Sequence, residues 1–374
     1  MYAWNMKIGV AKNKKKIFIS ALNQSTEIHP LWLRERVTNS DYLDKNNGQR
    51  LYEPSEIRKN LKIKSALIKN KHLNVKFNDG VESEFIIKDI INEIYKKIKK
   101  EEINYWDSKL QKKPIFKFKK NIFNTKEGYK ILKSFYKYGF IILRGTSVKK
   151  NYLIQFANLI GILRKTNFGT LFNVKSVRRA SDLAYTSHAL SAHTDNPYRR
   201  PIPGIQLLHC IKNDSVGGNS TLTDGFSVAK FMEKKFPKYF NLLSSIKIRF
   251  TYQDSKTILE NWGETIELNT DGSIKRVRLS PRLDYVPVLK KDKLDQFYKA
   301  RSLFIKLCNS KKFMIEFKLK PGDIMIMDNY RTLHGRTSYN MSIGERHLQG
   351  CYVDHDSVES NMKYLKRRFS LWAK

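Results

Sequence analysis

Apolar side chains recur at helical spacing in three segments of the chain. In residues 129–136 and 153–160 they fall on one face of a helix, and each series is followed by a glycine. The spacing predicts two amphipathic helices that end near Gly139 and Gly161, and a third over residues 293–308. The positions are Tyr129, Leu132, Phe135 and Tyr136; Leu153, Phe156, Ala157 and Ile160; and Leu294, Phe297, Tyr298, Phe304 and Leu307.

Shorter apolar runs elsewhere predict strands. Residues 140–143 are continuously apolar, as in a short buried strand. The first ~90 residues contain short strand patterns that flank turn signals such as Asn78-Asp79-Gly80. Predicted strands lie at 16–19, 73–77 and 84–87, and after residue 190 at 204–211, 246–252, 314–319, 324–327 and 347–353.

Many strands with a few packing helices predict a mainly β chain of the α+β class, with a barrel-like or sandwich core. No glycine-rich loop follows a strand, so nucleotide binding has no support. The charged segment 89–113 reads as a helix followed by polar chain and is the most plausible domain boundary. We therefore expect a small β-rich domain over residues 1–97 and a larger domain over 98–374.

The chain is strongly basic. It carries 71 Lys and Arg against 35 Asp and Glu, a net charge of +36. Such a charge can indicate a nucleic-acid or acidic-membrane partner. The lysine runs are scattered along the chain, however, which favours a solvated surface that also attracts small carboxylates. A nucleic-acid partner is therefore not the expectation.

Cysteine and hydropathy patterns bear on the compartment. The three cysteines, Cys210, Cys308 and Cys351, show no paired spacing, which indicates free thiols in a reducing compartment. No apolar run is long enough for a membrane span, and residues 1–20 lack the apolar stretch of a secretory signal. We expect a cytoplasmic protein without a membrane partner.

A histidine and an acidic residue stand two positions apart in the segment 190–197. On an extended strand, residues i and i+2 point to the same face, so His193 and Asp195 can bind one metal ion together. His334 lies at a predicted strand end far downstream. Two imidazoles and one carboxylate leave coordination positions open, which iron(II) oxygenases need to bind an oxoacid and dioxygen together. We therefore predict an iron site at His193, Asp195 and His334.

Other polar positions near these motifs suit a carboxylate cosubstrate. Arg346, on the strand after the distal histidine, can clamp a carboxylate through two parallel hydrogen bonds, although an isolated arginine is more often an ordinary ion-pair residue. The turn at 217–219 presents the Ser220 hydroxyl, which either helps to bind that carboxylate or belongs to a plain turn. His209 is interpreted as a core residue. His347 adjoins Arg346 on the strand, must face the other side, and is excluded from the iron site.

Several long motifs, in order along nearly the whole chain, resemble the gamma-butyrobetaine and trimethyllysine dioxygenase family. The N-terminal segments 30–35 and 48–51 resemble the small domain of that family. The catalytic motifs are Ala184-Tyr185-Thr186, Ala192-His193-Thr194-Asp195-Asn196-Pro197, Pro203-Gly204-Ile205-Gln206-Leu207-Leu208-His209-Cys210, Val216-Gly217-Gly218 through Asp224-Gly225-Phe226, Lys320-Pro321-Gly322-Asp323, and Asp328-Asn329 through His334-Gly335-Arg336.

The resemblance implies a double-stranded β-helix, or jelly roll, preceded by a small β-rich domain, and a homodimer. It assigns Fe(II) to His193, Asp195 and His334, and 2-oxoglutarate to Arg346 with Ser220 as a weaker helper. It also implies that oxidative decarboxylation of 2-oxoglutarate with O2 is coupled to hydroxylation of a C–H bond. No catalytic residue beyond the metal ligands is expected.

The small domain departs from the family pattern. Relatives hold a zinc ion through three cysteines and a histidine, and here Val37, Asn39, Tyr42 and Val81 stand at those positions. No cysteine precedes Cys210. We therefore expect no structural zinc and a domain that relies on packing.

Substrate recognition also departs from the family. The resemblance implies an aromatic cage for a trimethylammonium group at Phe168, Phe172, Tyr185 and Tyr352, because ring faces attract a desolvated cation. Each of these aromatics alone is more often a core residue. Asp182 stands where gamma-butyrobetaine enzymes carry an amide, which favours a substrate with an amino group, as trimethyllysine has.

An anion site could be restored by Arg278 or Arg282, and Arg282 is the position we adopt. The expected substrate is a small quaternary-ammonium acid of carnitine biosynthesis, either gamma-butyrobetaine or trimethyllysine. A second possibility keeps the chemistry but uses another zwitterion, such as an ammonium phosphonate. A third is a basic nucleic-acid-binding or scaffold protein that has kept the fold without catalysis.

Overall fold

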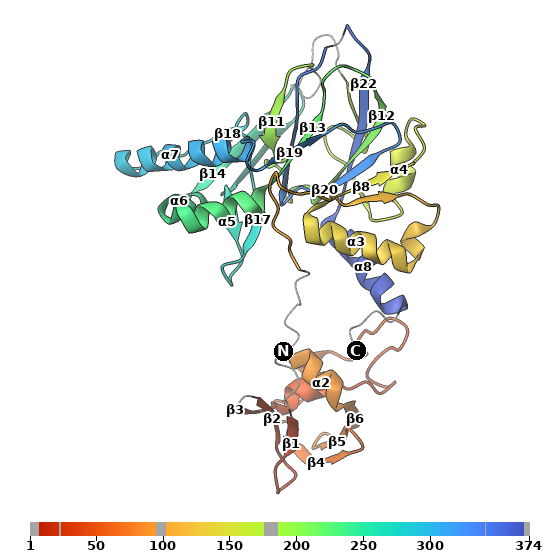
Figure 1. Cartoon of the computed structure of the whole chain (residues 1–374). Coiled ribbons are helices and arrows are strands. Elements are labelled where there is room, and N and C mark those ends of the chain that lie inside the picture. The colour runs from red at the N-terminus through yellow and green to blue at the C-terminus, as the bar shows by residue number, and fades with distance from the viewer. Residues whose placement is uncertain (1–6, 22–23, 95–101, 176–185, 341, 370–374) are drawn as a thin grey trace. The chain divides into compact units, whose positions relative to one another are not determined.

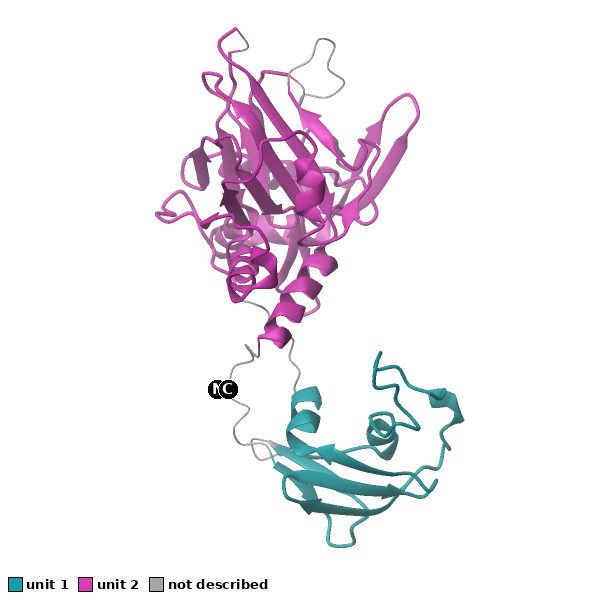
Figure 2. Cartoon of the chain, turned by 90° about the vertical axis from the view of Figure 1, so that its right-hand side faces the viewer, with its two compact units in different colours: residues 1–100 teal, residues 101–374 magenta. Residues whose placement is uncertain are grey.

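The computed structural model describes residues 7–21, 24–94, 102–175, 186–340 and 342–369. The chain divides into two compact units, residues 1–100 and 101–374, which are shown in separate colours in Figure 2. Among the described residues, no helix combines the length and the apolar character that crossing a membrane requires.

The described residues of the first unit form two small antiparallel sheets, two α-helices and a short 3-10 helix at Pro54–Glu56. One sheet is formed by β1 (Lys7–Val10), β2 (Ile17–Ala21) and β3 (Gln24–Glu27), and the other by β4 (Ile63–Lys69), β5 (His72–Phe77) and β6 (Glu82–Ile86). The helices are α1 (Pro30–Arg34) and α2 (Ile87–Ile94). In β5 and β6, alternate residues are buried, which is the pattern of strands with one face on a core.

The four positions where relatives bind zinc are occupied by ordinary packing and hydrogen bonds. Val37 and Val81 are buried in the core of the unit, and Tyr42 packs against it. Asn39 donates to the carbonyl of Glu82 and accepts from the hydroxyl of Ser83. These contacts explain how the unit closes around these side chains, and the absence of zinc stays a prediction.

The second unit is built around two β-sheets. The larger has seven strands in the order β10 (Phe172–Val174), β22 (Arg346–Val353), β12 (Ile205–Asn213), β20 (Ile324–Asp328), β8 (Phe140–Arg144) and β7 (Ile115–Lys117), with β9 (Leu163–Arg164) beside β22. The smaller has the order β11 (Leu190–His193), β21 (Thr332–Arg336), β13 (Ser220–Asp224) and β19 (Met314–Phe317). Every pairing except β7 with β8 is antiparallel.

Helices cover the outer faces of these sheets (Figure 1). α3 (Lys126–Tyr138), α4 (Tyr152–Ala157) and α8 (His355–Arg368) pack on the larger sheet, in a core that includes Phe135, Phe156 and Leu365. α5 (Gly225–Lys235), α6 (Pro237–Ser245) and α7 (Lys291–Cys308) form a second core on the other side. A third core holds side chains of both sheets, among them Leu208 and Leu222. This layered arrangement confirms the predicted fold class, a β jelly-roll core with packing helices.

Short strands lie between α6 and α7 along the chain. β14 (Lys247–Gln253) pairs with β15 (Ile258–Glu264) and β18 (Asp284–Tyr285), and β16 (Ile266–Leu268) pairs with β17 (Ile274–Val277). The predicted helix before Gly139 is α3, and this glycine ends it with φ +75°, a conformation that glycine adopts without steric cost.

Candidate metal centre

The three predicted ligands come together at the edge of the smaller sheet. His193 ends β11 and lies directly opposite His334 on β21. Asp195 Oδ1 is 3.5 Å from His193 Nε2 and 3.7 Å from His334 Nε2. Among the described residues, these three side chains form a potential metal-binding cluster, because their ligand atoms all lie within 4.8 Å of one another.

The expectation that His193 and Asp195 share one extended strand is wrong. β11 ends at His193, and Asp195 follows in a bend. The next residue, Asn196, has φ +51°, a left-handed conformation that asparagine tolerates better than most residues. The carboxylate therefore approaches the imidazoles from a bend that follows β11, and not through strand alternation.

Burial and neighbouring charges prepare the three groups for metal binding. Burial raises the pKa of Asp195, but His334, His193 and the Tyr352 hydroxyl outweigh it and bring the pKa well below its usual range. Burial and the neighbouring His193 lower the pKa of His334 to about 4. At neutral pH the site thus offers an ionised carboxylate and a neutral imidazole at His334, which are the forms that bind a metal.

The orientation of His193 is set by its backbone neighbour. Its Nδ1 lies 2.8 Å from the carbonyl of Ser191, which can only accept a hydrogen bond, so the proton belongs on Nδ1. The Nε2 lone pair then points toward Asp195 and His334. Two imidazole nitrogens and a carboxylate with open positions are the donor set of non-haem iron(II) oxygenases, so the residues fit that metal.

Two buried arginines line the same cavity of about 80 Å³. Arg346 donates from Nε to the carbonyl of Gly218, and its Nη1 has no partner among the described atoms. Burial and the neighbouring Arg336 lower the pKa of Arg346 to about 10. No described carboxylate lies within salt-bridge range of Arg346. Ser220, the cross-strand partner of Arg336, lines the cavity beside them.

The aromatic residues of the predicted cage are only partly brought together. Phe172 lines the cavity, and its ring centroid is 5.4 Å from that of Tyr352. Phe168 does not line the cavity and packs on Tyr252, 5.6 Å between centroids. Tyr352 also does not line it and instead donates its hydroxyl to Asp195 at 2.7 Å. Asp182 and Tyr185 lie outside the described residues.

The two candidate anion-binding arginines differ in their surroundings. Arg278 is held by Glu267 and by the carbonyl of Glu264, so it is occupied within the protein. Arg282 is exposed, and its charge contributes to lowering the pKa of His334. Arg282 therefore lies within electrostatic reach of the metal centre.

Sequence reasoning missed four polar residues around the centre. Arg336, Gln206, Asn329 and Tyr198 were left without a role, although all except Tyr198 stand in the motifs quoted above. The position of Gln206 in the sequence could have indicated a role near the centre. It is a polar residue in an apolar strand, and every second position there faces the inside of the sheet pair.

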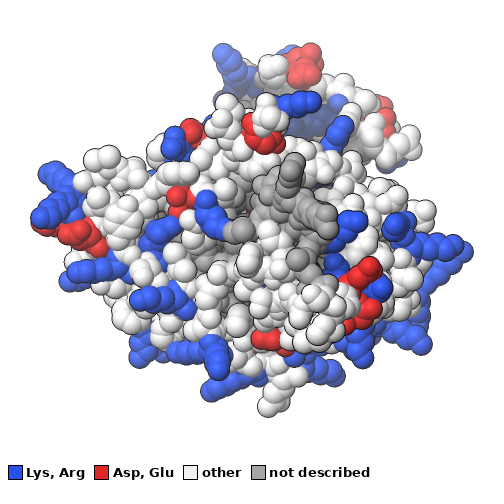
Figure 3. Space-filling model, turned by 90° about the horizontal axis from the view of Figure 1, so that it is seen from above, with Lys and Arg blue, Asp and Glu red and all other residues white. Residues whose placement is uncertain are grey.

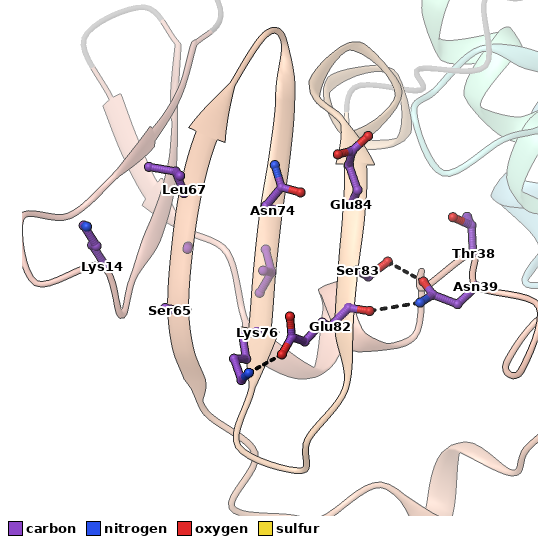
Figure 4. Close-up of a pocket in the computed structure, with 12 residues that line it drawn as sticks. Lys14, Thr38, Asn39, Ser65, Leu67, Asn74, Lys76, Glu82, Ser83 and Glu84 are labelled. Carbon is purple, nitrogen blue, oxygen red and sulfur yellow. Dashed lines mark hydrogen bonds and ion pairs between the residues drawn. The ribbon is translucent and has the colours of Figure 1, made fainter.

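A larger cavity belongs to the first unit. A groove of about 590 Å³ crosses β4, β5 and β6 of the first unit (Figure 4). Several of its polar groups are paired with one another, in the Lys76–Glu82 ion pair and the contacts of Asn39 with Glu82 and Ser83. The groove has no convergent set of metal ligands among the described residues, and we assign it no role.

The chain resembles known dioxygenases over most of its length. The family described as "Taurine catabolism dioxygenase TauD, TfdA family" matches residues 107–352. Gamma-butyrobetaine dioxygenase of Homo sapiens is 32% identical over 365 residues, covering 92% of this chain and 93% of that protein. The gamma-butyrobetaine dioxygenase of Pseudomonas sp. (strain AK-1) is 34% identical over 229 residues, 61% of this chain and 60% of that protein. Mitochondrial trimethyllysine dioxygenase of Rattus norvegicus is 27% identical over 348 residues, which cover 90% of this chain and 82% of that protein.

The matched region contains the whole histidine–aspartate–histidine cluster and both cavity arginines. The match covers more than half of the chain, and the human relative covers nearly all of it. The chain therefore belongs to the TauD/TfdA family and is a 2-oxoglutarate-dependent dioxygenase that uses Fe(II).

Proposed function

We propose that this dioxygenase hydroxylates a C–H bond of a small quaternary-ammonium acid. The observation that carries the proposal is one cavity that holds both a histidine–aspartate–histidine cluster and the buried Arg346, whose Nη1 has no partner among the described atoms. The first set suits iron, and the second suits a dicarboxylate cosubstrate.

In this proposal His193, Asp195 and His334 hold Fe(II), and Arg346 binds the distal carboxylate of 2-oxoglutarate with help from Ser220. Arg336 adds positive charge, while its own guanidinium donates to the carbonyls of His188 and Thr186. When bound, iron and 2-oxoglutarate supply an oxidative decarboxylation with O2 that gives succinate, carbon dioxide and a hydroxylated product.

The side chains around the centre orient the ligands and limit access of water. Leu208, Met325 and Leu348 form an apolar wall of the cavity. Low polarity strengthens the attraction between Arg346 and a carboxylate, because water competes less for either charge. The cavity thus favours binding of the cosubstrate carboxylate beside Arg346.

The substrate cation would meet aromatic rings. Phe172 and Tyr352 are neighbours, and a second aromatic group holds Tyr252 between Phe168 and the buried Tyr198. Ring faces attract a desolvated quaternary ammonium group. Gamma-butyrobetaine is favoured by the identity to relatives named for it, whereas Asp182 favours trimethyllysine. Arg282 would bind the substrate anion.

We also propose that the chain acts as a cytoplasmic homodimer, with the first unit as a small accessory domain and the second as the catalytic domain. The oligomeric state rests on the resemblance to the family. In the view of Figure 3, lysines and arginines are spread along the edge and do not gather in one patch.

The proposal is tested by turnover. Protein loaded with Fe(II) is given 2-oxoglutarate, O2 and one of gamma-butyrobetaine, trimethyllysine or an ammonium phosphonate, and succinate and hydroxylated product are measured together. We expect equal amounts of both with one of the first two compounds, and none with His334→Ala. His72→Ala, which changes a half-buried histidine of the first unit, serves as the control. Product only from the phosphonate, or none from any compound while 2-oxoglutarate is consumed, would contradict the proposed substrate class.

A further inference from the structure

One oxygen of Asp195 accepts hydrogen bonds from two side chains of the larger sheet. Gln206 Nε2 and the Tyr352 hydroxyl both donate to Asp195 Oδ2, at 2.5 and 2.7 Å. The other oxygen, Oδ1, is the atom that faces His193 Nε2 and His334 Nε2. The two carboxylate oxygens therefore have separate environments.

The two donors converge because of strand pairing. Gln206 on β12 and Tyr352 on β22 are direct cross-strand partners, so their side chains leave the same face of the sheet. Both are almost fully buried, with exposures of 2% and 3%. A buried carboxylate oxygen with two donors is fully satisfied and has little tendency to leave them for a metal.

The backbone of Asp195 is fixed independently. The Asn329 amide accepts from the N–H of Asp195 at 2.8 Å and donates to its carbonyl at 3.0 Å. The same amide donates to the carbonyl of Pro203. This contact holds the bend before the left-handed Asn196, so rotation of the carboxylate is the remaining freedom, and Gln206 and Tyr352 restrict it.

Gln206 also keeps one atom available. Its Oε1 is buried and has no hydrogen-bond partner among the described atoms, while its side chain lines the cavity. The Nε2 must face the ionised carboxylate, which cannot donate, so Oε1 faces away from Asp195. An unsatisfied buried acceptor is costly for stability, which favours a role toward a ligand over a role in packing.

We propose that Gln206 and Tyr352 are positioning residues that restrict Asp195 to binding iron through one oxygen, which keeps coordination positions open for 2-oxoglutarate and O2. Tyr352 has a second consequence. Its ring belongs to the proposed substrate surface and its hydroxyl to the metal carboxylate, so a bound cation can influence the metal centre through a single side chain. The positioning of Asp195 rests on the iron role proposed for it, and the second consequence rests also on the proposed substrate cation.

The test measures metal binding without turnover. Anaerobic Fe(II) titration, and the visible absorption of the Fe(II)–2-oxoglutarate complex, are recorded for Tyr352→Phe and Gln206→Met. Tyr352→Phe keeps the ring and removes only the hydroxyl. We expect Fe(II) affinity to fall by roughly 10-fold or more in each variant, as is usual when a partner of a metal ligand is lost, and the absorption band to shift.

Matched controls separate positioning from general damage. Tyr330→Phe removes a buried tyrosine hydroxyl that donates to the Ile202 carbonyl, and Gln349→Met removes a buried glutamine of the same strand as Tyr352. Both should bind iron as the native chain does. If Gln206→Met does not fold, as judged by circular dichroism, Gln206→Asn keeps the amide but withdraws it by one methylene.

Iron affinity and absorption that stay native in Tyr352→Phe and in a folded Gln206 variant would overturn the proposal. A raised Michaelis constant for the substrate with native iron binding would likewise reduce Tyr352 to a substrate contact. Failure of the proposed function has a different signature. In that case no ammonium acid is turned over, or Asp195→Ala binds iron as tightly as the native chain, whatever the Gln206 and Tyr352 variants do.

Discussion

Two buried arginines in the catalytic unit have opposite electrostatic surroundings. Replacing each by methionine should separate effects on 2-oxoglutarate binding from effects on the stability of the fold. Arg331 is paired with Asp224 through two hydrogen bonds and also donates to the carbonyls of Asn104 and Lys137. Burial lowers the pKa of Arg331, but Asp224 outweighs it and the net pKa is raised. Arg346 has no carboxylate partner among the described residues, and burial together with the neighbouring Arg336 lowers its pKa to about 10.

The magnitudes follow from these environments. Since one pKa unit corresponds to about 1.4 kcal/mol, the charge of Arg346 costs the folded state about 3 kcal/mol. Arg346→Met removes this cost and loses one hydrogen bond to Gly218, worth about 1 kcal/mol. The ligand-free protein should become more stable by about 2 kcal/mol. Arg331→Met should instead lose about 3 to 5 kcal/mol, because Asp224 is left buried and unpaired.

Binding should change in the opposite sense. Loss of a buried charge contact typically weakens binding by about 2 kcal/mol or more. Arg346→Met should therefore raise the Michaelis constant for 2-oxoglutarate by roughly 30-fold or more. Arg331→Met should leave that constant unchanged where the protein is folded. The assay combines urea unfolding of the ligand-free proteins with initial rates over a range of 2-oxoglutarate concentrations.

The reasoning fails if Arg346→Met destabilises the protein as strongly as Arg331→Met does, since Arg346 would then be a structural residue. It fails equally if the Michaelis constant of Arg346→Met stays native.

Three further outcomes are expected. His209 is fully buried, and burial lowers its pKa from 6.5 to about 4. As the pH falls through this interval, the unfolded chain takes up a proton that the folded chain does not, so the free energy of unfolding should drop by up to about 3 kcal/mol. Urea unfolding of His209→Leu should lack this share of the pH dependence. Elemental analysis of the Asp195→Ala, His334→Ala double variant, purified without added metal, should find no stoichiometric zinc, and one retained zinc per chain would refute the prediction for the first unit. Asp182→Asn should shift activity toward gamma-butyrobetaine relative to trimethyllysine with unchanged 2-oxoglutarate kinetics, and equal effects on both substrates would remove Asp182 from substrate choice.

Local patterns were sufficient to predict the elements whose apolar residues are dense. α3, α7, β12, β20 and β22 all lie where periodicity placed them, because each buries a regular set of side chains. α8 was missed although Val358, Met362 and Leu365 are buried at helical spacing. Its charged residues outnumber those three, so a pattern based on apolar positions is weak there. The segment 89–113, predicted as a helix followed by polar chain, begins within α2, and its residues 102–113 contain no helix.

The metal cluster was accessible from sequence for a different reason. The chemistry of His193, Asp195 and His334 limits what they can do together, even though the strand geometry expected for Asp195 was wrong. The surroundings of Asp195 were not accessible. Gln206 and Tyr352 meet only because β12 pairs with β22 in one register, and Asn329 reaches Asp195 only after the chain has turned at Asp328. Contacts between strands far apart in sequence depend on topology, which local patterns do not contain.

Iron binding tests the central claim most directly. Protein freed of metal is titrated anaerobically with Fe(II) in the presence of 2-oxoglutarate, and the weak visible band of the chelate is followed in the native chain, His334→Ala and the His72→Ala control. We predict that the band saturates at one iron per chain in the native protein and the control, and that it is absent in His334→Ala, because two remaining ligands cannot hold the chelate geometry. An undiminished band in His334→Ala at the same stoichiometry would contradict the proposed site.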